Sequence, residues 1–339
     1  MDYRRLGKTG LSVSRLGLGG IPIQRSTAEG TRALIGELLR AGVNFIDTAR
    51  GYTVSEEYLG YALQGVRDRF VLATKSMART REAMAADVER SLQNLRTDYI
   101  DLYQIHNPSA ADLDTVMAPG GALEALFAAK AAGKIGHIGI TLHSADLFRR
   151  AIDLPWVETV MFPYNIVETQ GEEWIARCAE RDIGFLAMKP LAGGAIEDAA
   201  TALRFVTQNP AVTVVIPGMA DAAEVTKNAA AVAEASPLTS GEKEKIAAVR
   251  LSLGEHFCRR CNYCAPCGAG INIPAVFLFE GYYSRYDLKE WAEARYATLA
   301  KKASDCIGCG ACEARCPYGL PIREMMKRAA SVMEKGENE

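Results

Sequence analysis

The chain has 339 residues, enough for one large domain and one small domain, or for two domains of medium size. Hydrophobic residues make up 49% and charged residues 24% of the sequence, the balance of an ordinary globular protein. A net charge of −2 gives no electrostatic basis for binding nucleic acid or an anionic membrane. The amino-terminal MDYRRLGKTG lacks the apolar segment of a secretory signal, and no run approaches the ~18 apolar residues of a membrane helix. We therefore expect a cytoplasmic protein with no nucleic-acid or membrane partner.

The first elements along the chain predict a barrel-like architecture. YRRLGKTGLSVSRL predicts a hairpin that turns at residues 8–10. Short apolar runs then alternate with longer amphipathic runs up to residue 235. The apolar runs are SRLGLGG, VNFIDTA, FVLATKS, YIDLYQIH, IGHIGITL, TVMFPYN, GFLAMKPL and VTVVIPG. The stretches between them, such as TREAMAADVERSLQNL, have the i, i+3, i+4 apolar spacing of a helix, which is typical of a parallel sheet covered by helices.

Eight strand–helix units in roughly 220 residues fit an α/β fold of the TIM-barrel type, (β/α)8, which takes about 250 residues. An open doubly wound sheet is the alternative. Its usual GxGxxG after the first strand is missing, because LGLGGIPIQR has a different spacing. We predict a TIM barrel over residues 1–235, a linker and helix over 236–257, and a small cysteine-rich domain over 258–330.

Four polar groups are predicted at the carboxyl ends of consecutive strands, where TIM barrels place catalytic residues. They are Asp47, Tyr52, Lys75 and His106. Any one of them alone is explained equally well as a helix cap or a solvated side chain, but four together favour a reaction site. The set suits carbonyl reduction, in which the oxygen gains charge and needs a proton donor. An ammonium held by a carboxylate lowers the pKa of a nearby phenol, and a histidine orients the carbonyl.

At these residues the sequence resembles the aldo-keto reductases. The matching segments are FIDTARGYTVSEEYLG (45–60), the lysine of VLATKS (71–76) and the histidine of YIDLYQIH (99–106). The resemblance implies that Tyr52 is the general acid, assisted by Lys75 and Asp47, and that His106 positions a small carbonyl or alcohol substrate. It also implies NAD(H) or NADP(H) as the hydride carrier, bound in extended form across the barrel mouth without a Rossmann motif.

The resemblance implies a set of cofactor contacts that departs from the better-known members. The positions are Gly20, Thr141, Met188, Gly218, Met219, Glu224 and Asn228. Gly218 and Glu224 replace a lysine and an arginine that bind the 2′-phosphate of NADPH in those members. The carboxylate of Glu224 would repel that phosphate. Thr141–Leu142 replace a serine–asparagine pair, Met161 replaces a glutamine, and Met188 replaces a stacking tyrosine. These differences leave the identity of the hydride carrier open.

The histidines outside this set and one isolated cysteine have simpler interpretations. His137 lies within a strand and is interpreted as a hydrogen-bonded core histidine. His143, at the end of the fifth strand, is either a loop residue or a ligand in the pocket. His256 packs near the first cysteine of the arrays. Cys178 stands alone on a helical pattern, where core packing is the expected role.

Eight of the nine cysteines form two arrays with metal-ligand spacing. The arrays are Cys258, Cys261, Cys264 and Cys267, followed by Cys306, Cys309, Cys312 and Cys316. A reducing cytosol favours metal binding over disulfides. The second array, with Pro317, matches the C-x2-C-x2-C-x3-C-P signature of a 4Fe–4S cluster, and the first is one residue shorter before its fourth cysteine. Zinc is the alternative, but it normally takes two CxxC pairs per site. The arrays therefore predict two 4Fe–4S clusters.

In paired ferredoxin clusters the fourth cysteine of each run ligates the other cluster. This rule assigns one cluster to Cys258, Cys261, Cys264 and Cys316, and the other to Cys306, Cys309, Cys312 and Cys267. The insert between the arrays is helical in character and resembles α-helical ferredoxins. Some bacterial and archaeal aldo-keto reductases carry such a ferredoxin-like domain at the carboxyl end, and this chain resembles them.

We expect an oxidoreductase of the aldo-keto reductase type with two 4Fe–4S clusters. The alternative is a redox-sensing or electron-transfer protein whose barrel binds a ligand without turnover, and the intact tetrad argues against it. Nicotinamides deliver electron pairs and clusters pass single electrons, so direct exchange requires an intermediary such as a flavin, for which the sequence carries no motif. Three interpretations of the clusters therefore remain: they exchange electrons with a partner protein, they stabilise a small domain that has little core, or they sense redox state.

Overall fold

The computed structural model describes residues 1–334 and divides into two compact units. The first unit comprises Met1–Leu191 and Asp198–Thr239. The second comprises Ala192–Glu197 and the chain from Ser240 onward, so a short segment that follows a barrel strand belongs to the second unit. No helix within residues 1–334 has both the length and the apolar character needed to cross a membrane.

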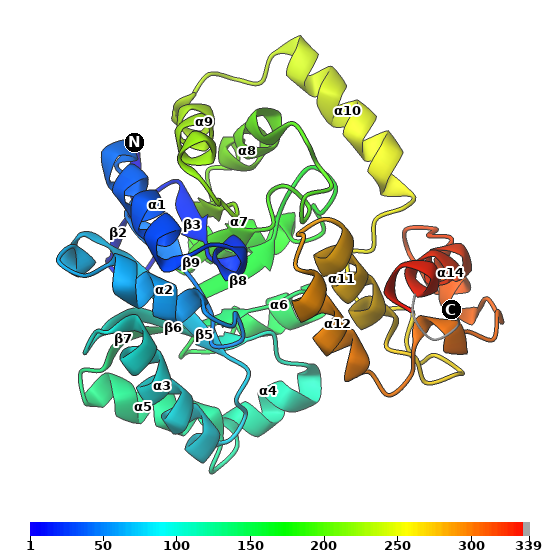
Figure 1. Cartoon of the computed structure of the whole chain (residues 1–339), viewed down its shortest axis with the longest axis horizontal. Coiled ribbons are helices and arrows are strands. Elements are labelled where there is room, and N and C mark those ends of the chain that lie inside the picture. Colours follow the sequence, from blue (N-terminus) through cyan, green and yellow to red (C-terminus); the bar gives the residue numbers. More distant parts are fainter. Residues whose placement is uncertain (335–339) are drawn as a thin grey trace. The chain divides into compact units, whose positions relative to one another are not determined.

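The first unit is an eight-stranded parallel barrel (Figure 1). Its strands are β3 (Gly17–Gly19), β4 (Phe45–Asp47), β5 (Val71–Ser76), β6 (Ile100–His106), β7 (Ile135–Thr141), β8 (Thr159–Pro163), β9 (Gly184–Met188) and β10 (Val214–Ile216). They pair in chain order, and parallel bridges from Leu16 to Val215 and from Gly19 to Gly218 join the last strand to the first. The predicted TIM barrel is confirmed, and each strand lies within the apolar run predicted for it.

An antiparallel hairpin precedes the barrel. Its strands are β1 (Tyr3–Arg5) and β2 (Ser12–Ser14), which confirms the predicted turn. Gly7 has a φ of 52°, a left-handed conformation that glycine adopts without a Cβ clash. Leu6 and Val13 are fully buried in the same cluster as inward-facing strand residues such as Phe45. The hairpin therefore contributes to the core inside the barrel.

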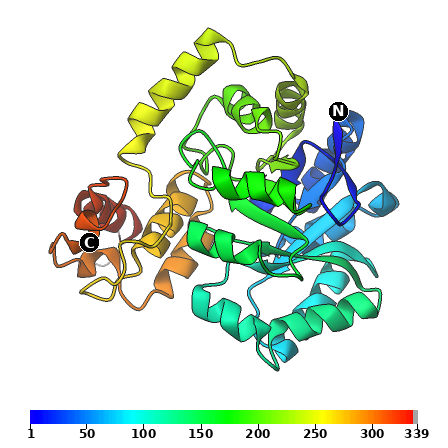
Figure 2. The same ribbon diagram turned by 180° about the vertical axis from the view of Figure 1, so that it is seen from behind.

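Helices surround the strands of this unit (Figures 1 and 2). They are α1 (Ala28–Ala41), α2 (Ser55–Ala62), α3 (Arg81–Leu95), α4 (Ala110–Met117), α5 (Ala122–Ala131), α6 (Ala145–Ala151), α7 (Glu172–Glu180), α8 (Ala199–Gln208) and α9 (Ala222–Ala233), with 3₁₀ helices at Ile21–Arg25 and Arg67–Arg69. The polar stretch HNPSAADLD reads as a barrel-mouth loop, but it contains the start of α4. Ser109 and Asp112 form a capping box there, which satisfies the first free amides of the helix.

Side chains alternate between the inside and the outside of the barrel along each strand. The inner cluster contains Phe45, Ala73 and Leu102, and the outer cluster contains their neighbours Ile46, Leu72 and Tyr103. The next inward positions along these strands are Asp47, Lys75 and Gln104. The alternation therefore directs three polar side chains toward the barrel axis, near the carboxyl ends of β4, β5 and β6.

The second unit is built from helices and cysteine-containing loops. Its helices are α10 (Ser240–Gly254), α11 (Ile273–Ser284), α12 (Lys289–Ala297), α13 (Ala311–Ala314) and α14 (Ile322–Met333), with a 3₁₀ helix at Ala303–Asp305. Helix α11 packs against both α12 and α14 (Figure 1). Val276, Tyr296 and Met326 form part of a core that also includes the cysteines. The predicted helical insert between the arrays and the predicted last helix are confirmed.

Candidate functional site

A buried polar network lies at the ends of β4, β5 and β6. The Nζ atom of Lys75 donates to Oδ2 of Asp47 at 2.5 Å and to the carbonyl oxygen of Thr48 at 2.8 Å. Nε2 of Gln104 donates to the other carboxylate oxygen, Oδ1 of Asp47, at 3.0 Å. All three side chains are buried, with Lys75 only 2% exposed. The ammonium and the carboxylate therefore compensate each other's charge in a position that water does not reach.

Burial dominates the electrostatics of this pair. Desolvation lowers the pKa of Lys75, and the attraction and hydrogen bond of Asp47 oppose that shift. Desolvation likewise raises the pKa of Asp47, against the attraction of Lys75 and the hydrogen bonds from Lys75 and Gln104. Each charge is therefore maintained by its partner.

Tyr52 lies beside the pair, in the turn between β4 and α2. Its ring centroid is 4.9 Å from Nζ of Lys75, within the range of a cation–π contact. The ring of His106 meets the ring of Tyr52 edge-on, with centroids 6.2 Å apart and planes at 88°. The structure thus brings together the four predicted residues Asp47, Tyr52, Lys75 and His106.

Sequence reasoning missed Gln104. In YIDLYQIH it lies two residues after the inward-facing Leu102 and two before His106. The period-2 alternation of the strand identifies Gln104 only once Leu102 is known to face inward, because a polar residue at an inward position near the end of a barrel strand faces the site.

The predicted cofactor residues lie at the ends of the other strands or just beyond them. A Cβ atom on Gly20 would lie 2.7 Å from the carbonyl oxygen of Asp47, and one on Gly218 would lie 2.8 Å from Cγ of Pro22. Both glycines therefore permit a close approach that a side chain would prevent. Oγ1 of Thr141 accepts a hydrogen bond from the Asn107 amide at 3.0 Å. The side chain of Met219 is fully buried in the outer core.

Acidic residues occupy the start of α9. Oε2 of Glu224 accepts a hydrogen bond from the amide of Ala220 at 2.6 Å, and Oδ1 of Asp221 accepts one from the amide of Glu224 at 2.9 Å. A helix amino terminus attracts anions, but here two carboxylates already fill that role. Asn228, one turn further along α9, is buried.

Met161, Met188 and His143 differ in burial and in their contacts. Met161 is buried in the cluster inside the barrel, and Met188, at the end of β9, is half-buried against that cluster. Nδ1 of His143 lies 3.0 Å from Oδ1 of Asn107, so this histidine contacts the loop that follows β6.

Cys178 lies in the core, as predicted, whereas His137 is hydrogen-bonded as predicted but is half-buried and not part of the core. Nδ1 of His137 lies 2.7 Å from Oε2 of Glu158, and Oε1 of the same carboxylate accepts from Nζ of Lys130 at 2.6 Å. Burial alone would raise the pKa of Glu158, but hydrogen bonds from His137, Lys130 and the Ile138 amide lower it to about 2. Cys178 is fully buried, and burial raises its pKa to about 12, so it is not a reactive thiolate.

In the second unit, one cavity gathers cysteines from both arrays. Cys267 of the first array lines it together with Cys306, Cys309 and Cys312 of the second. The rest of the lining is largely apolar and includes Ile271, Ile322 and Met326. These four cysteines are the set that the ferredoxin rule assigns to one cluster.

The other four cysteines also lie close together. Burial is the main cause that raises the pKa of Cys264 to about 12, and Cys258, Cys261 and Cys312 contribute to the same shift. Cys316 raises the pKa of Cys261 in the same way, after burial. Cys316 follows Arg315, whose guanidinium donates to carbonyl oxygens of the first array, so the end of the second array lies against the first.

Two arginines make contacts between the two cysteine arrays. Arg315, in the second array, donates to the carbonyl oxygens of Cys264 and Pro266, each at 2.6 Å. Arg259, in the first array, lies with its guanidinium carbon 4.0 Å from the ring centroid of Tyr318. Within residues 1–334 no three His, Cys, Asp or Glu side chains surround a position for a single metal ion. The thiolates of a 4Fe–4S cluster instead bind four separate irons.

Comparisons with known proteins agree with both parts of the chain. Residues 15–201 match the model of the aldo/keto reductase family, and residues 257–321 match that of the 4Fe-4S dicluster domain. The chain is 35% identical over 195 residues to aldo-keto reductase YhdN of Bacillus subtilis, which covers 51% of this chain and 56% of YhdN. It is 28% identical over 218 residues to L-galactose dehydrogenase of Arabidopsis thaliana, which covers 58% of this chain and 68% of that protein.

Among solved structures, the holo form of aldo-keto reductase AKR11C1 from Bacillus halodurans is similar, with a TM-score of 0.63 and 26% identity. The match covers 74% of this chain and 96% of that structure. The chain spans little more than half the length of YhdN and about two thirds of the Arabidopsis enzyme, at 56% and 68%.

Proposed function

The chain belongs to the aldo/keto reductase family and carries a 4Fe–4S dicluster domain, and on this basis we propose that it interconverts a small carbonyl compound and its alcohol, with Tyr52 as the general acid–base. The observation that carries the proposal is the buried Lys75–Asp47 pair beside the Tyr52 ring. A barrel that only bound a ligand would have no need to bury this charge pair next to a phenol.

Each residue of the site has a defined task in the proposed reaction. A bound nicotinamide supplies hydride to the carbonyl carbon. The hydroxyl of Tyr52 gives its proton to the carbonyl oxygen, and the nearby ammonium of Lys75 stabilises the phenolate that is left. Asp47 holds that ammonium in place, and Gln104 in turn holds the Asp47 carboxylate. His106, edge-on to the Tyr52 ring, orients the carbonyl oxygen by donating a hydrogen bond to it.

The start of α9 supports NAD(H) over NADP(H) as the carrier. The carboxylates of Asp221 and Glu224 already accept the local amides, so a 2′-phosphate would meet two negative charges there.

The cysteine sets support two 4Fe–4S clusters that exchange single electrons with an external carrier. Cys309 is exposed, although the thiols around it line a partly apolar cavity. Ile307, two residues before Cys309, is 70% exposed and offers apolar surface beside this cluster for a weak, transient contact with a redox partner.

The proposed reaction is tested by Tyr52→Phe in iron-loaded protein, assayed anaerobically with NADH against a panel of aldehydes and ketones. We expect turnover to fall by about 10²–10⁴-fold, the usual contribution of a general acid. Nicotinamide affinity is expected to stay unchanged, because the hydroxyl acts on the substrate oxygen.

The matched control is Tyr58→Phe, which removes the same hydroxyl from the half-buried tyrosine on α2. It is expected to turn over at the wild-type rate. Wild-type protein that binds nicotinamide but reduces no carbonyl, and oxidises no alcohol, would favour a sensing or electron-transfer protein instead. Equal activity of Tyr52→Phe and wild type would reject Tyr52 as the acid.

A further inference from the structure

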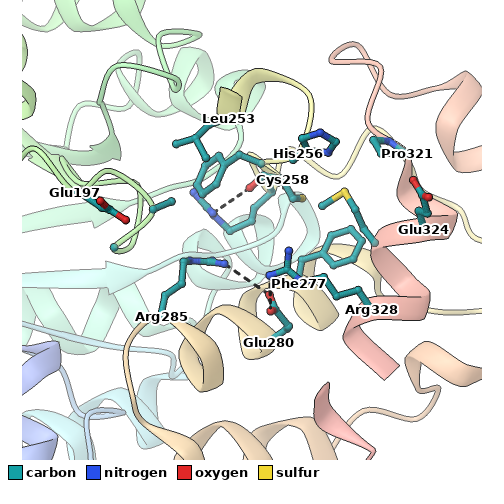
Figure 3. Close-up of a pocket in the computed structure, with 15 residues that line it drawn as sticks. Glu197, Leu253, His256, Cys258, Phe277, Glu280, Arg285, Pro321, Glu324 and Arg328 are labelled. Carbon is teal, nitrogen blue, oxygen red and sulfur yellow. Dashed lines mark hydrogen bonds and ion pairs between the residues drawn. The ribbon is translucent and has the colours of Figure 1, made fainter. Parts of the chain in front are cut away.

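The second unit contains a cavity of about 520 Å³ that the reductase chemistry does not use (Figure 3). Its walls come from segment 192–197, the end of α10, the first cysteine array, α11 and α14. The volume lies within the range of about 300–1,000 Å³ that is typical of small-molecule sites. The chemistry of its lining therefore indicates what kind of molecule it fits.

Three guanidinium groups lie on one part of the wall. Nη1 of Arg285 is 3.6 Å from Oε2 of Glu280, and Nη2 of Arg328 is 3.2 Å from Oε1 of the same carboxylate. Nε of Arg285 also donates to the carbonyl oxygen of Gly193 at 3.2 Å. Arg260, from the first cysteine array, is the third guanidinium. Arg285 and Arg328 thus both pair with the carboxylate of one buried glutamate, Glu280.

Three arginines and three glutamates line the cavity, and Glu280 is the glutamate that pairs with two of the arginines. Burial lowers the pKa of Arg285, and the charges of Arg260 and Arg328 lower it further, while Glu280 opposes them. The other two acidic lining residues, Glu197 and Glu324, are exposed and lie on opposite sides of the cavity in Figure 3. A bound anion would relieve the repulsion among the three arginines.

The rest of the wall is apolar and aromatic. Phe257 and Phe277 are both buried, and Leu253 and Met325 add aliphatic surface. The guanidinium of Arg260 lies 5.3 Å from the centroid of the Phe257 ring. Aromatic rings beside fixed guanidinium groups bind flat conjugated molecules that carry a phosphate or carboxylate.

The fourth feature of the wall is Cys258, a member of one predicted cluster set. From these features together we propose that the cavity binds a phosphorylated flavin of the flavin mononucleotide type. The ring system lies on the phenylalanines near Cys258, and the phosphate lies toward Arg285 and Arg328. Flavins take part in both hydride and one-electron chemistry, which is the intermediary that nicotinamide and iron–sulfur clusters need. This redox role rests on the function proposed above, whereas binding of the flavin does not.

Calorimetric titration of the full iron-loaded chain with flavin mononucleotide, under anaerobic conditions, tests the site. Arg328→Gln removes an exposed guanidinium from the wall and leaves Glu280 paired with Arg285. We expect it to weaken flavin mononucleotide binding by about tenfold or more, as loss of a charge-assisted hydrogen bond does. Lys327→Gln is the matched control, because it removes one charge from the adjacent exposed position of α14 and does not line the cavity.

Riboflavin, which lacks the phosphate, separates the two halves of the site. It is expected to bind wild-type protein more weakly than flavin mononucleotide and to bind Arg328→Gln as well as wild type. The proposal would be overturned if flavin mononucleotide gave no heat of binding with wild type, or if Arg328→Gln and Lys327→Gln weakened its binding equally. It would also be overturned if Arg328→Gln lost as much affinity for riboflavin as for flavin mononucleotide. Because the titration needs no carbonyl turnover, flavin binding and the role of Tyr52 are tested independently, and either proposal can fail while the other succeeds.

Discussion

Asp47→Asn isolates the charge of the buried pair from its shape. Asparagine keeps the size of the side chain and retains an oxygen for the Lys75 ammonium. Oε1 of Gln104 has no hydrogen-bond partner within residues 1–334, so the Gln104 amide can turn and accept from the new NH₂ group. The substitution therefore removes one negative charge and few contacts. The ammonium of Lys75, 2% exposed, is left without its counter-ion.

The expected loss of stability follows from that burial. Breaking a buried ion pair by removing one partner costs about 3–5 kcal/mol of unfolding free energy. The pH dependence has a definite sign. Burial already lowers the pKa of Lys75 below its usual 10.5, and Asp47 opposes that shift. Without Asp47 the pKa falls further, so the unfolded state binds more protons than the folded state over a wider range. The deficit of the variant should therefore shrink as the pH rises from neutral toward 10.

Urea unfolding of wild type, Asp47→Asn, Lys75→Met and the double variant, at several pH values between 7 and 10, measures these quantities. The double variant should lose less than the sum of the two single losses, because it leaves no isolated charge. A loss below about 1 kcal/mol for Asp47→Asn, or a deficit that is constant with pH, would show that the pair is not a buried charge pair and would refute this reasoning.

Two further predictions concern other parts of the chain. Glu158→Gln should lower the free energy of unfolding by on the order of 1 kcal/mol. Because the pKa of Glu158 is lowered to about 2, this stability is present above about pH 4.5 and is lost as the pH falls toward 2. The urea midpoints of the variant and the wild type should therefore converge on acidification. Cys309→Ala should reduce bound iron from about eight to about four atoms per chain, since it removes one ligand of one cluster. Cys178→Ala, the control, should keep the full iron content, and an unchanged iron content in Cys309→Ala would reject its role as a ligand.

Much of the barrel could be predicted because its signals are local. Each strand is a short apolar run, and the tetrad residues come at the ends of such runs. Gln104 was missed because its meaning depends on which face of β6 points inward, which the sequence alone leaves ambiguous until Leu102 is placed in the inner cluster. The start of α4 was missed because Ser109 and Asp112 cap a helix with polar residues that also suit a loop. The arginine-lined cavity has no sequence signal at all, because its walls come from five separate segments.

The residues between the cysteines give the two arrays different surroundings. A C-x2-C spacing fixes the number of residues between ligands but leaves their side chains free to vary. In the first array the first spacer pair consists of two arginines: Arg259 stacks on Tyr318, just after the second array, and Arg260 lines the cavity.

In the second array the first spacer pair is Ile307 and Gly308, and Gly310 begins the next. Both glycines have positive φ, at 70° and 75°, so the chain turns tightly and presents little side-chain bulk around the exposed Cys309. The first array therefore suits binding a small anionic molecule, and the second suits contact with a larger redox partner. Substituting Ile307 should accordingly slow electron exchange with an external protein carrier without changing the affinity for flavin mononucleotide.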